Sequence, residues 1–84
     1  MSYAVVFKPS AEREFRNLPP HIQSRLAREL ASLIETPRPA GCKKLKARPG
    51  YRIRVGDYRV IYAVDDPARL VRVLAVANRR DVYR

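Results

Sequence analysis

Residues 51–62, YRIRVGDYRVIY, decide the fold of this chain. Two runs of β-forming residues flank Gly56-Asp57, and a leading glycine suits a two-residue hairpin turn. Such a turn fixes the register of the two strands, and it places Arg54 directly opposite Arg59. The other predicted pairs are Val55 with Tyr58, Ile53 with Val60, Arg52 with Ile61, and Tyr51 with Tyr62.

Side chains alternate along a strand, so this register separates the hairpin into an apolar face and a basic face. The apolar face carries Tyr51, Ile53, Val55, Tyr58, Val60 and Tyr62. The basic face carries Arg52, Arg54 and Arg59 together with Ile61 and Ala63. Like charges opposite one another destabilise a strand pair. A solvated surface is one interpretation of this face, but three converging arginines favour a phosphate-binding patch, because guanidinium groups match phosphate oxygens in a fork geometry.

Length and charge restrict the class of protein. The chain has 84 residues, which predicts a single domain over residues 1–84. Its formal net charge is +10, from 18 Lys plus Arg against 8 Asp plus Glu, and 14 of the basic residues are arginines. This balance indicates a polyanion ligand or an acidic partner.

The sequence favours a cytoplasmic protein. Cys42 is the single cysteine, so no internal disulfide is possible, and a reducing compartment fits this. No apolar run approaches the roughly 20 residues of a membrane span. Residues 1–10 lack the basic start and the long apolar run of a secretory signal.

Two helices are expected before the hairpin. Residues 2–7 resemble a strand, and residues 10–18 have helical spacing at Ala11, Phe15 and Leu18. After Pro19-Pro20, a stronger stripe extends to residue 35 and consists of Ile22, Leu26, Leu30, Leu33 and Ile34. A membrane-surface helix would show the same stripe, but a core-facing helix is commoner. Residues 36–50 contain three prolines and two glycines and are expected to form a long basic loop.

Residues 70–76 predict a further strand after a turn at residues 65–69. A five-residue turn pairs Val64 with Leu70 and Arg59 with Ala75, and it puts Val71, Val73 and Ala75 on the basic face. Arg72 then faces the helices, which is unfavourable, and a turn one residue shorter would reverse the faces. Arg79 is in phase with the basic face if the strand continues.

The predicted fold class is α+β, in the order β-α-α-β-β-β. Two consecutive helices followed by a three-stranded meander imply a small, antiparallel-dominated, four-stranded sheet with both helices on one face. The apolar face of the hairpin packs under the helices, and the basic face is left open.

Familiar catalytic sets are missing from the sequence. His21 is the only histidine and stands at a helix start, so no Ser-His-Asp arrangement can be assembled. One His and one Cys far apart do not make a zinc site, and Asp65-Asp66 is a turn signal before it is a magnesium site. We therefore expect no metal and no cofactor. Metal-free phosphate chemistry remains, in which the RNA 2′-hydroxyl is the nucleophile and arginines stabilise the developing charge.

The segments KKLKARPGYRIRVGDYRVIYAVDD and VRVLAVANRRDVYR, together with FKPSAEREFRNLP, resemble the RelE/ParE superfamily of toxins from type II toxin–antitoxin systems. The RelE branch fits best, and the resemblance covers essentially the whole chain. It implies a compact sheet with two helices. It also implies metal-free cleavage of messenger RNA on the ribosome, which leaves a 2′,3′-cyclic phosphate.

The resemblance implies roles for particular residues. Arg52 and Arg54 fall at two basic positions of the first hairpin strand, and Arg59 falls at the arginine that stabilises the transition state. Arg79 and Tyr83 fall at a later arginine and at a tyrosine near the C-terminus. The contacts to ribosome and RNA would come from Lys43, Lys44, Lys46, Arg48 and Arg80.

The chain departs from the family pattern at two places. Arg52 and Arg54 stand where the best-studied pattern has lysines, and arginine is a poor general base. Asn78 stands where many relatives have a histidine. Two alternatives therefore stay open: a ParE-like poison of DNA gyrase, and a nucleic-acid-binding or regulatory relative with little catalytic activity.

The resemblance also implies the partners. These are an acidic, RelB-like antitoxin, messenger RNA and the ribosome, with DNA contacted only through the antitoxin complex and with no membrane contact. The net charge of +10 agrees with an acidic partner.

Overall fold

The hairpin forms in the predicted register. In the computed structural model, which describes residues 2–78, β3 (Tyr51–Val55) pairs with β4 (Tyr58–Asp65). All five predicted pairs are present, including Arg54 opposite Arg59. Gly56 has a φ of 62°, and Asp57 has no positive φ. This combination belongs to the type II′ turn, whose twist matches that of the flanking strands.

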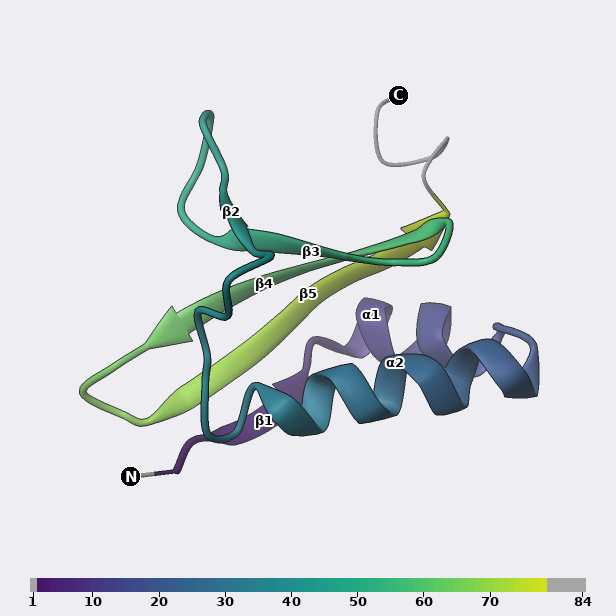
Figure 1. Ribbon diagram of the computed structural model, residues 1–84, viewed down its shortest axis with the longest axis horizontal. Helices are drawn as coiled ribbons and strands as arrows, with labels where there is room; N and C mark the ends of the chain where they lie inside the picture. The colour runs from purple at the N-terminus through teal and green to yellow at the C-terminus, as the bar shows by residue number, and fades with distance from the viewer. Residues whose placement is uncertain (1, 79–84) are drawn as a thin grey trace.

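Five strands form one sheet, in the order β1-β5-β4-β3-β2 (Figure 1). β1 (Ala4–Phe7) runs parallel to β5 (Leu70–Asn78), and the other three pairings are antiparallel. The prediction of an antiparallel-dominated sheet is correct, but the predicted strand count of four was one too low. The additional strand, β2 (Lys43–Lys44), lies inside the segment expected to be a loop. Two residues among prolines and glycines give no periodic signal.

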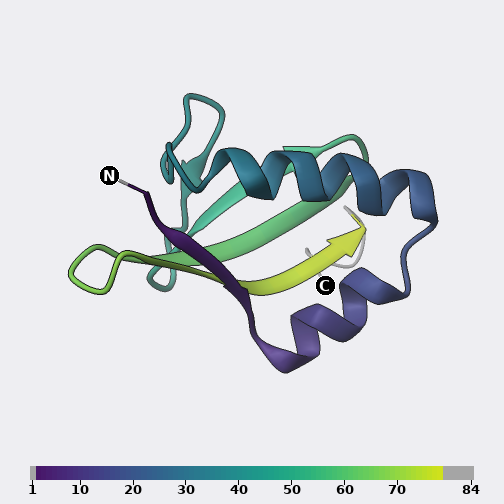
Figure 2. The ribbon, with the colours of Figure 1, turned by 90° about the horizontal axis from the view of Figure 1, so that it is seen from below.

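Both helices cover one face of the sheet, as Figure 2 shows from below. They are α1 (Pro9–Arg16) and α2 (Pro20–Ser32). The core between the layers contains Ala11, Leu26, Leu30, Leu33, Ile53, Val55, Val60, Tyr62, Val71, Val73 and Val76. α2 ends before residue 35, because the N–H groups of Leu33 and Ile34 bond to carbonyls three residues back in a tighter turn. Among the described residues, no helix is long and apolar enough to cross a membrane.

The predicted register of the last strand is wrong at its start. Asp65 pairs with Leu70 and Val64 with Val71, so the connecting turn is one residue shorter than expected. Arg69 closes this turn at a φ of 55°, a conformation that arginine rarely adopts and that the sequence does not signal. Val71 and Val73 therefore belong to the core and not to the basic face, while Arg72 is exposed.

A bulge in β5 then changes which residues face the core. Ile61 pairs with Ala75, but the next residue of β4, Tyr62, pairs with Val73, so β5 contains one additional residue at this point. Beyond the bulge, Val76 is buried in the core, and Arg59 pairs with Ala77 rather than with Ala75. Ala75 and Ala77 thus lie beside Ile61 and Arg59, where their small side chains leave room for long ones.

Helix α1 supplies a hydrogen bond close to this bulge. β1 ends at Phe7, which pairs with Val73, so β5 has no β1 partner beyond that point. Glu14 accepts a hydrogen bond from the backbone N–H of Val76 at 2.9 Å through Oε1. A carboxylate thus takes the place of the missing strand, because a buried N–H without a partner would be costly.

We predict that Glu14→Ala destabilises the domain by about 1–3 kcal/mol, because the N–H of Val76 then loses its acceptor. The melting temperature should fall by about 4–8 °C for each kcal/mol in a domain of this size. Glu14→Gln keeps an acceptor and should cost less. Glu12→Ala is the matched control, because the Glu12 side chain lies on the same helix and makes an exposed ion pair at 3.5 Å with Arg16. Equal melting temperatures for Glu14→Ala and Glu12→Ala would contradict the prediction.

Candidate functional site

The basic face of the hairpin gains a fourth cation from β2. Lys43 pairs directly with Arg52, and residues that pair across strands share a face of the sheet. A pocket of about 100 Å³ is lined by Gly41, Lys43, Arg52, Arg54 and Arg59. Lys43 was predicted from the sequence to lie in a flexible loop. In the structure Lys43 lies in a strand and lines the same pocket as the three hairpin arginines. We call this pocket the basic pocket.

Burial differs strongly among these four cations. Arg59 is 5% exposed, Arg52 is half-buried, and Arg54 and Lys43 are exposed. The expectation of a uniformly open basic face is therefore wrong. Arg59 stands on β4, the middle strand of the sheet, which has β3 on one side and β5 on the other. The result is a buried arginine with a rim of more exposed cations.

A second, wider groove continues from the basic pocket. It has a volume of about 630 Å³ and is lined by Lys43, Lys44, Leu45, Lys46, Ala47, Arg48 and Arg52. Lys43 and Arg52 line both the pocket and the groove, so the two are contiguous. The four residues of the 36–50 segment that were predicted to contact RNA or ribosome, Lys43, Lys44, Lys46 and Arg48, thus line a groove beside the hairpin arginines.

The chemistry of this surface is that of an anion site. No carboxylate lines either hollow, and the described residues contain no cluster of three His, Cys, Asp or Glu side chains that could hold a metal ion. Partly buried guanidinium groups stabilise phosphate oxygens more strongly than exposed ones, because water screens them less. The arrangement can therefore bind a phosphate chain and stabilise negative charge that develops deep in the pocket.

Three predicted site residues, Arg79, Arg80 and Tyr83, lie outside the described part of the chain. Asn78 is the last described residue, and it pairs with Tyr58 at the end of β5. The chain therefore enters the undescribed segment from the end of β5 beside the hairpin turn.

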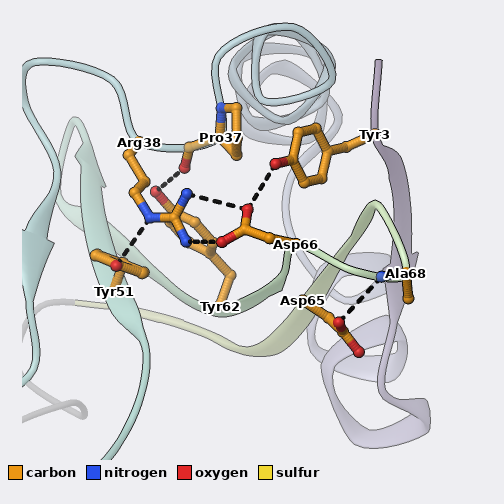
Figure 3. A network of polar contacts seen from close by, with 8 residues as sticks. All are labelled: Tyr3, Pro37, Arg38, Tyr51, Tyr62, Asp65, Asp66 and Ala68. Carbon is orange, nitrogen blue, oxygen red and sulfur yellow. Dashed lines mark hydrogen bonds and ion pairs between the residues drawn. The ribbon is translucent and has the colours of Figure 1, made fainter. Parts of the chain in front are cut away.

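Sequence reasoning missed a polar network that lies at the base of the 36–50 segment (Figure 3). Arg38 donates to both carboxylate oxygens of Asp66, at 3.2 and 2.8 Å, and its Nε donates to the Tyr51 hydroxyl at 2.9 Å. The Tyr3 hydroxyl donates to Asp66 at 2.6 Å. Asp66 lies 28 residues from Arg38 and 63 from Tyr3. No local pattern signals pairs so distant; the Asp65-Asp66 dipeptide indicated only a turn.

Electrostatics favour the charged form of this network at neutral pH. The hydrogen bonds from Arg38 and then from Tyr3 hold the pKa of Asp66 below its ordinary value of 3.8. The hydrogen bond to Asp66 raises the pKa of Tyr3, so its hydroxyl keeps the proton that it donates. Burial raises the pKa of Tyr62, whose hydroxyl donates to the carbonyl of Pro37 at 2.8 Å.

Known proteins resemble the chain over nearly its whole length. Residues 5–83 match the family described as the ParE toxin of the type II toxin–antitoxin system parDE. The toxin RelG of Mycobacterium tuberculosis is 33% identical and covers 100% of this chain and 99% of its own. The mRNA interferase toxin RelE of Escherichia coli K12 is 31% identical, over 99% of this chain and 92% of its own. The toxin–antitoxin complex RelBE2 of Mycobacterium tuberculosis contains a chain that superposes with a TM-score of 0.83 at 29% identity, covering 94% of this chain and 93% of that one.

We predict that Asp66 makes the stability of the fold sensitive to acid. A lowered folded pKa means that the stabilisation is complete above the unfolded value of 3.8 and is lost as the pH falls through the folded value. Melting temperatures measured between about pH 7 and about pH 2 should therefore fall more steeply in the wild type than in Asp66→Asn, which should already be less stable at neutral pH. The control is Glu35→Gln, an exposed acid outside the network. Parallel curves for wild type and Asp66→Asn would exclude the assigned role.

Proposed function

The chain belongs to the RelE/ParE family of toxins from type II toxin–antitoxin systems and is RelE-like, and from this premise we propose that it is a metal-independent endoribonuclease that cleaves messenger RNA on the ribosome. The observation that carries the proposal is the basic pocket, where Arg59 lies deep and Lys43, Arg52 and Arg54 surround it. A relative that is 31% identical is named an mRNA interferase, which supports the same reaction.

The proposed reaction needs little chemistry from the protein. The RNA 2′-oxygen attacks the adjacent phosphorus, the bond from phosphorus to the 5′-oxygen breaks, and a 2′,3′-cyclic phosphate and a 5′-hydroxyl result. The 2′-hydroxyl loses a proton and the departing oxygen gains one. Arg59 would stabilise the negative charge on the pentacovalent phosphorus, because the pocket already orients its guanidinium before reaction. Arg52 and Arg54 would hold the flanking phosphate oxygens, and Lys43 would close the rim.

Proton transfer is the part that the pocket arginines do not supply, since guanidinium groups stay protonated. We assign this role, and the orientation of the scissile nucleotide, to Tyr83 with Arg79 beside it, as the family resemblance implies. Arg80 would contact RNA or ribosome. These three assignments remain predictions. Asn78 has no basic nitrogen, so it is excluded as a proton shuttle.

A second candidate function is favoured by one observation: the family match is to toxins described as ParE. A gyrase poison would inhibit supercoiling of plasmid DNA by purified gyrase and would leave translated messages uncut. A regulatory relative without catalytic activity would bind RNA and cut nothing. Primer extension on translated messages, run in parallel with the supercoiling assay, separates the three functions.

The proposed partner is an acidic, RelB-like antitoxin, which would mediate any contact with DNA. A related structure is a toxin–antitoxin complex, and the charge of this chain favours carboxylates near the basic pocket. An apolar groove of about 310 Å³ could take the apolar face of an antitoxin helix. The groove is lined by Val5, Phe7, Phe15, Ala27, Leu30, Ala31 and Ile34. An antitoxin that binds only the folded toxin would also raise its melting temperature.

We predict that Arg59→Ala lowers the cleavage rate by about 100- to 1,000-fold, the usual loss when one preorganised transition-state donor is removed. Primer extension on translated messages measures the rate, and circular dichroism reports whether the variant is folded. Arg72→Ala is the matched control, because Arg72 is an exposed arginine that pairs with Ala63 and lines neither the pocket nor the groove. A folded Arg59→Ala protein that retains full toxicity would refute the assignment of the pocket.

We predict a different result for the groove. Simultaneous replacement of Lys44, Lys46 and Arg48 by Gln should raise the apparent KM and spare the rate at saturation, because exposed cations at a distance from Arg59 add affinity rather than transition-state stabilisation. The salt dependence of binding should also become shallower, by about 0.7 in logarithmic slope for each lost phosphate contact. A saturated rate that falls as far as in Arg59→Ala would instead include the groove in the active site.

A further inference from the structure

Arg38 and Tyr51 close the segment that carries the groove. They lie 13 residues apart in sequence, and between them are Gly41 and the groove cations Lys43, Lys44, Lys46 and Arg48. The Nε of Arg38 donates to the Tyr51 hydroxyl at 2.9 Å, and the guanidinium carbon lies 5.3 Å from the centre of the Tyr51 ring. Tyr51 is the residue before Arg52 in β3, so this contact joins the start of the segment to the first strand of the basic pocket.

Asp66 fixes Arg38 to a part of the fold that does not belong to the segment. Its carboxylate accepts from both terminal nitrogens of Arg38, at 3.2 and 2.8 Å, and this fork geometry defines the plane of the guanidinium. Asp66 lies in the turn between β4 and β5, and Tyr3, just before β1, donates to the same carboxylate at 2.6 Å. Arg38 is therefore held by Asp66 and Tyr51 from two other segments of the chain, and Tyr3 from a third segment bonds to its carboxylate partner, as Figure 3 shows.

The adjoining backbone is fixed at both ends of the segment. Tyr62 is fully buried, stacks on Tyr51 with ring centres 5.8 Å apart, and donates to the carbonyl of Pro37 at 2.8 Å. At the other end, Gly50 has a φ of 126°, and a Cβ there would lie 2.9 Å from the Tyr62 carbonyl oxygen. The segment thus begins and ends on the same tyrosine pair. Between these ends, Lys43 and Lys44 pair with β3, Cys42 packs against the core, and the Leu45 N–H donates to the Gly50 carbonyl at 3.0 Å.

We propose that Arg38 is a positioning residue for polyanion binding: its contacts with Asp66 and Tyr51 hold residues 39–50 against the hairpin, so that Gly41 and Lys43 form the wall of the basic pocket. The statement that the segment binds a polyanion rests on the proposed function. The statement that Arg38 holds the segment rests on the hydrogen bonds of the network. The Arg38–Asp66 pair is about half exposed, so it adds little stability as an isolated ion pair. The main effect of the Arg38–Asp66 pair is to fix the position of residues 39–50.

Arginine is specifically suited to this position. Three of its nitrogens are used at once, two toward a carboxylate and one toward a hydroxyl, while its plane lies near an aromatic ring. Lysine has a single nitrogen on a flexible stem, so it can satisfy Asp66 or Tyr51 but cannot fix the angle between them. Arg38→Lys should therefore retain the net charge and lose most of the positioning.

The first test measures the segment without using any enzymatic reaction. Amide hydrogen exchange over residues 39–50, including the N–H groups of Cys42 and Leu45, should become at least about fivefold faster in Arg38→Gln and Arg38→Lys. Exchange in β4 and β5 should stay unchanged. The matched control is Arg16→Gln, which removes the same charge from an exposed pair on α1. Unchanged protection of residues 39–50 in both Arg38 variants would overturn the inference, whatever the activity of the protein.

The second test measures binding with a 2′-O-methyl RNA oligonucleotide, which lacks the nucleophile and so cannot be cleaved. Arg38→Gln should weaken its binding by about fivefold or more, and Arg16→Gln by less than about twofold. In a protein that already has Lys44, Lys46 and Arg48 replaced by Gln, the Arg38→Gln effect should shrink, because the two changes act through one segment. Full additivity, or equal losses for Arg38→Gln and Arg16→Gln, would overturn the inference. If exchange over residues 39–50 becomes faster in the Arg38 variants but the wild-type protein leaves messages uncut, only the proposed nuclease function is refuted.

Discussion

The reversal of the chain in two residues at Gly56 and Asp57 sets the register that places Arg52, Arg54 and Arg59 on one face of the sheet. The φ of 62° at Gly56 permits a turn that pairs Val55 with Tyr58. A slip of one residue between β3 and β4 would exchange the two faces of a strand and bring arginines toward the helices. The buried side chains of Ile53, Val55 and Val60 oppose such a slip, because they would be transferred to the other face. The apolar face thus stabilises the register that the basic face needs.

That dependence explains which parts of the structure the sequence could predict. The hairpin, the two helices and the basic face follow from local turn chemistry and periodicity, and all of them are present. The start of β5 could not be predicted, because its register depends on a positive φ at Arg69 and on a bulge after Val73. β2 was missed because a strand of two residues is too short to show an alternating pattern of side chains. The Arg38 network was missed because its partners meet only in the tertiary structure.

Gathering cations on one face of the sheet costs hydration free energy, and this cost differs among the cations. Arg54 and Lys43 are exposed and keep most of their hydration, whereas Arg59 at 5% exposure gives up most of its contact with water. Arg59 stands on β4, the middle strand of the five, whereas Lys43 stands on β2 at the edge of the sheet. The arginine with the largest desolvation cost is thus also the one whose field is least screened and whose direction is best fixed. Desolvation and preorganisation arise there from the same burial.

The remaining cations are held by a different principle. Lys44, Lys46 and Arg48 project from a segment with no substantial core of its own, so their positions depend on how that segment is tethered. An apolar tether would need buried volume that a chain of 84 residues can hardly add, because small proteins bury a limited part of their surface. A polar tether at the neck needs only a few side chains, and Arg38, Asp66 and Tyr51 provide directional bonds there. Directionality, rather than bond strength, then decides how well the groove cations are aligned with the pocket, since an exposed ion pair contributes little energy but a forked one fixes orientation.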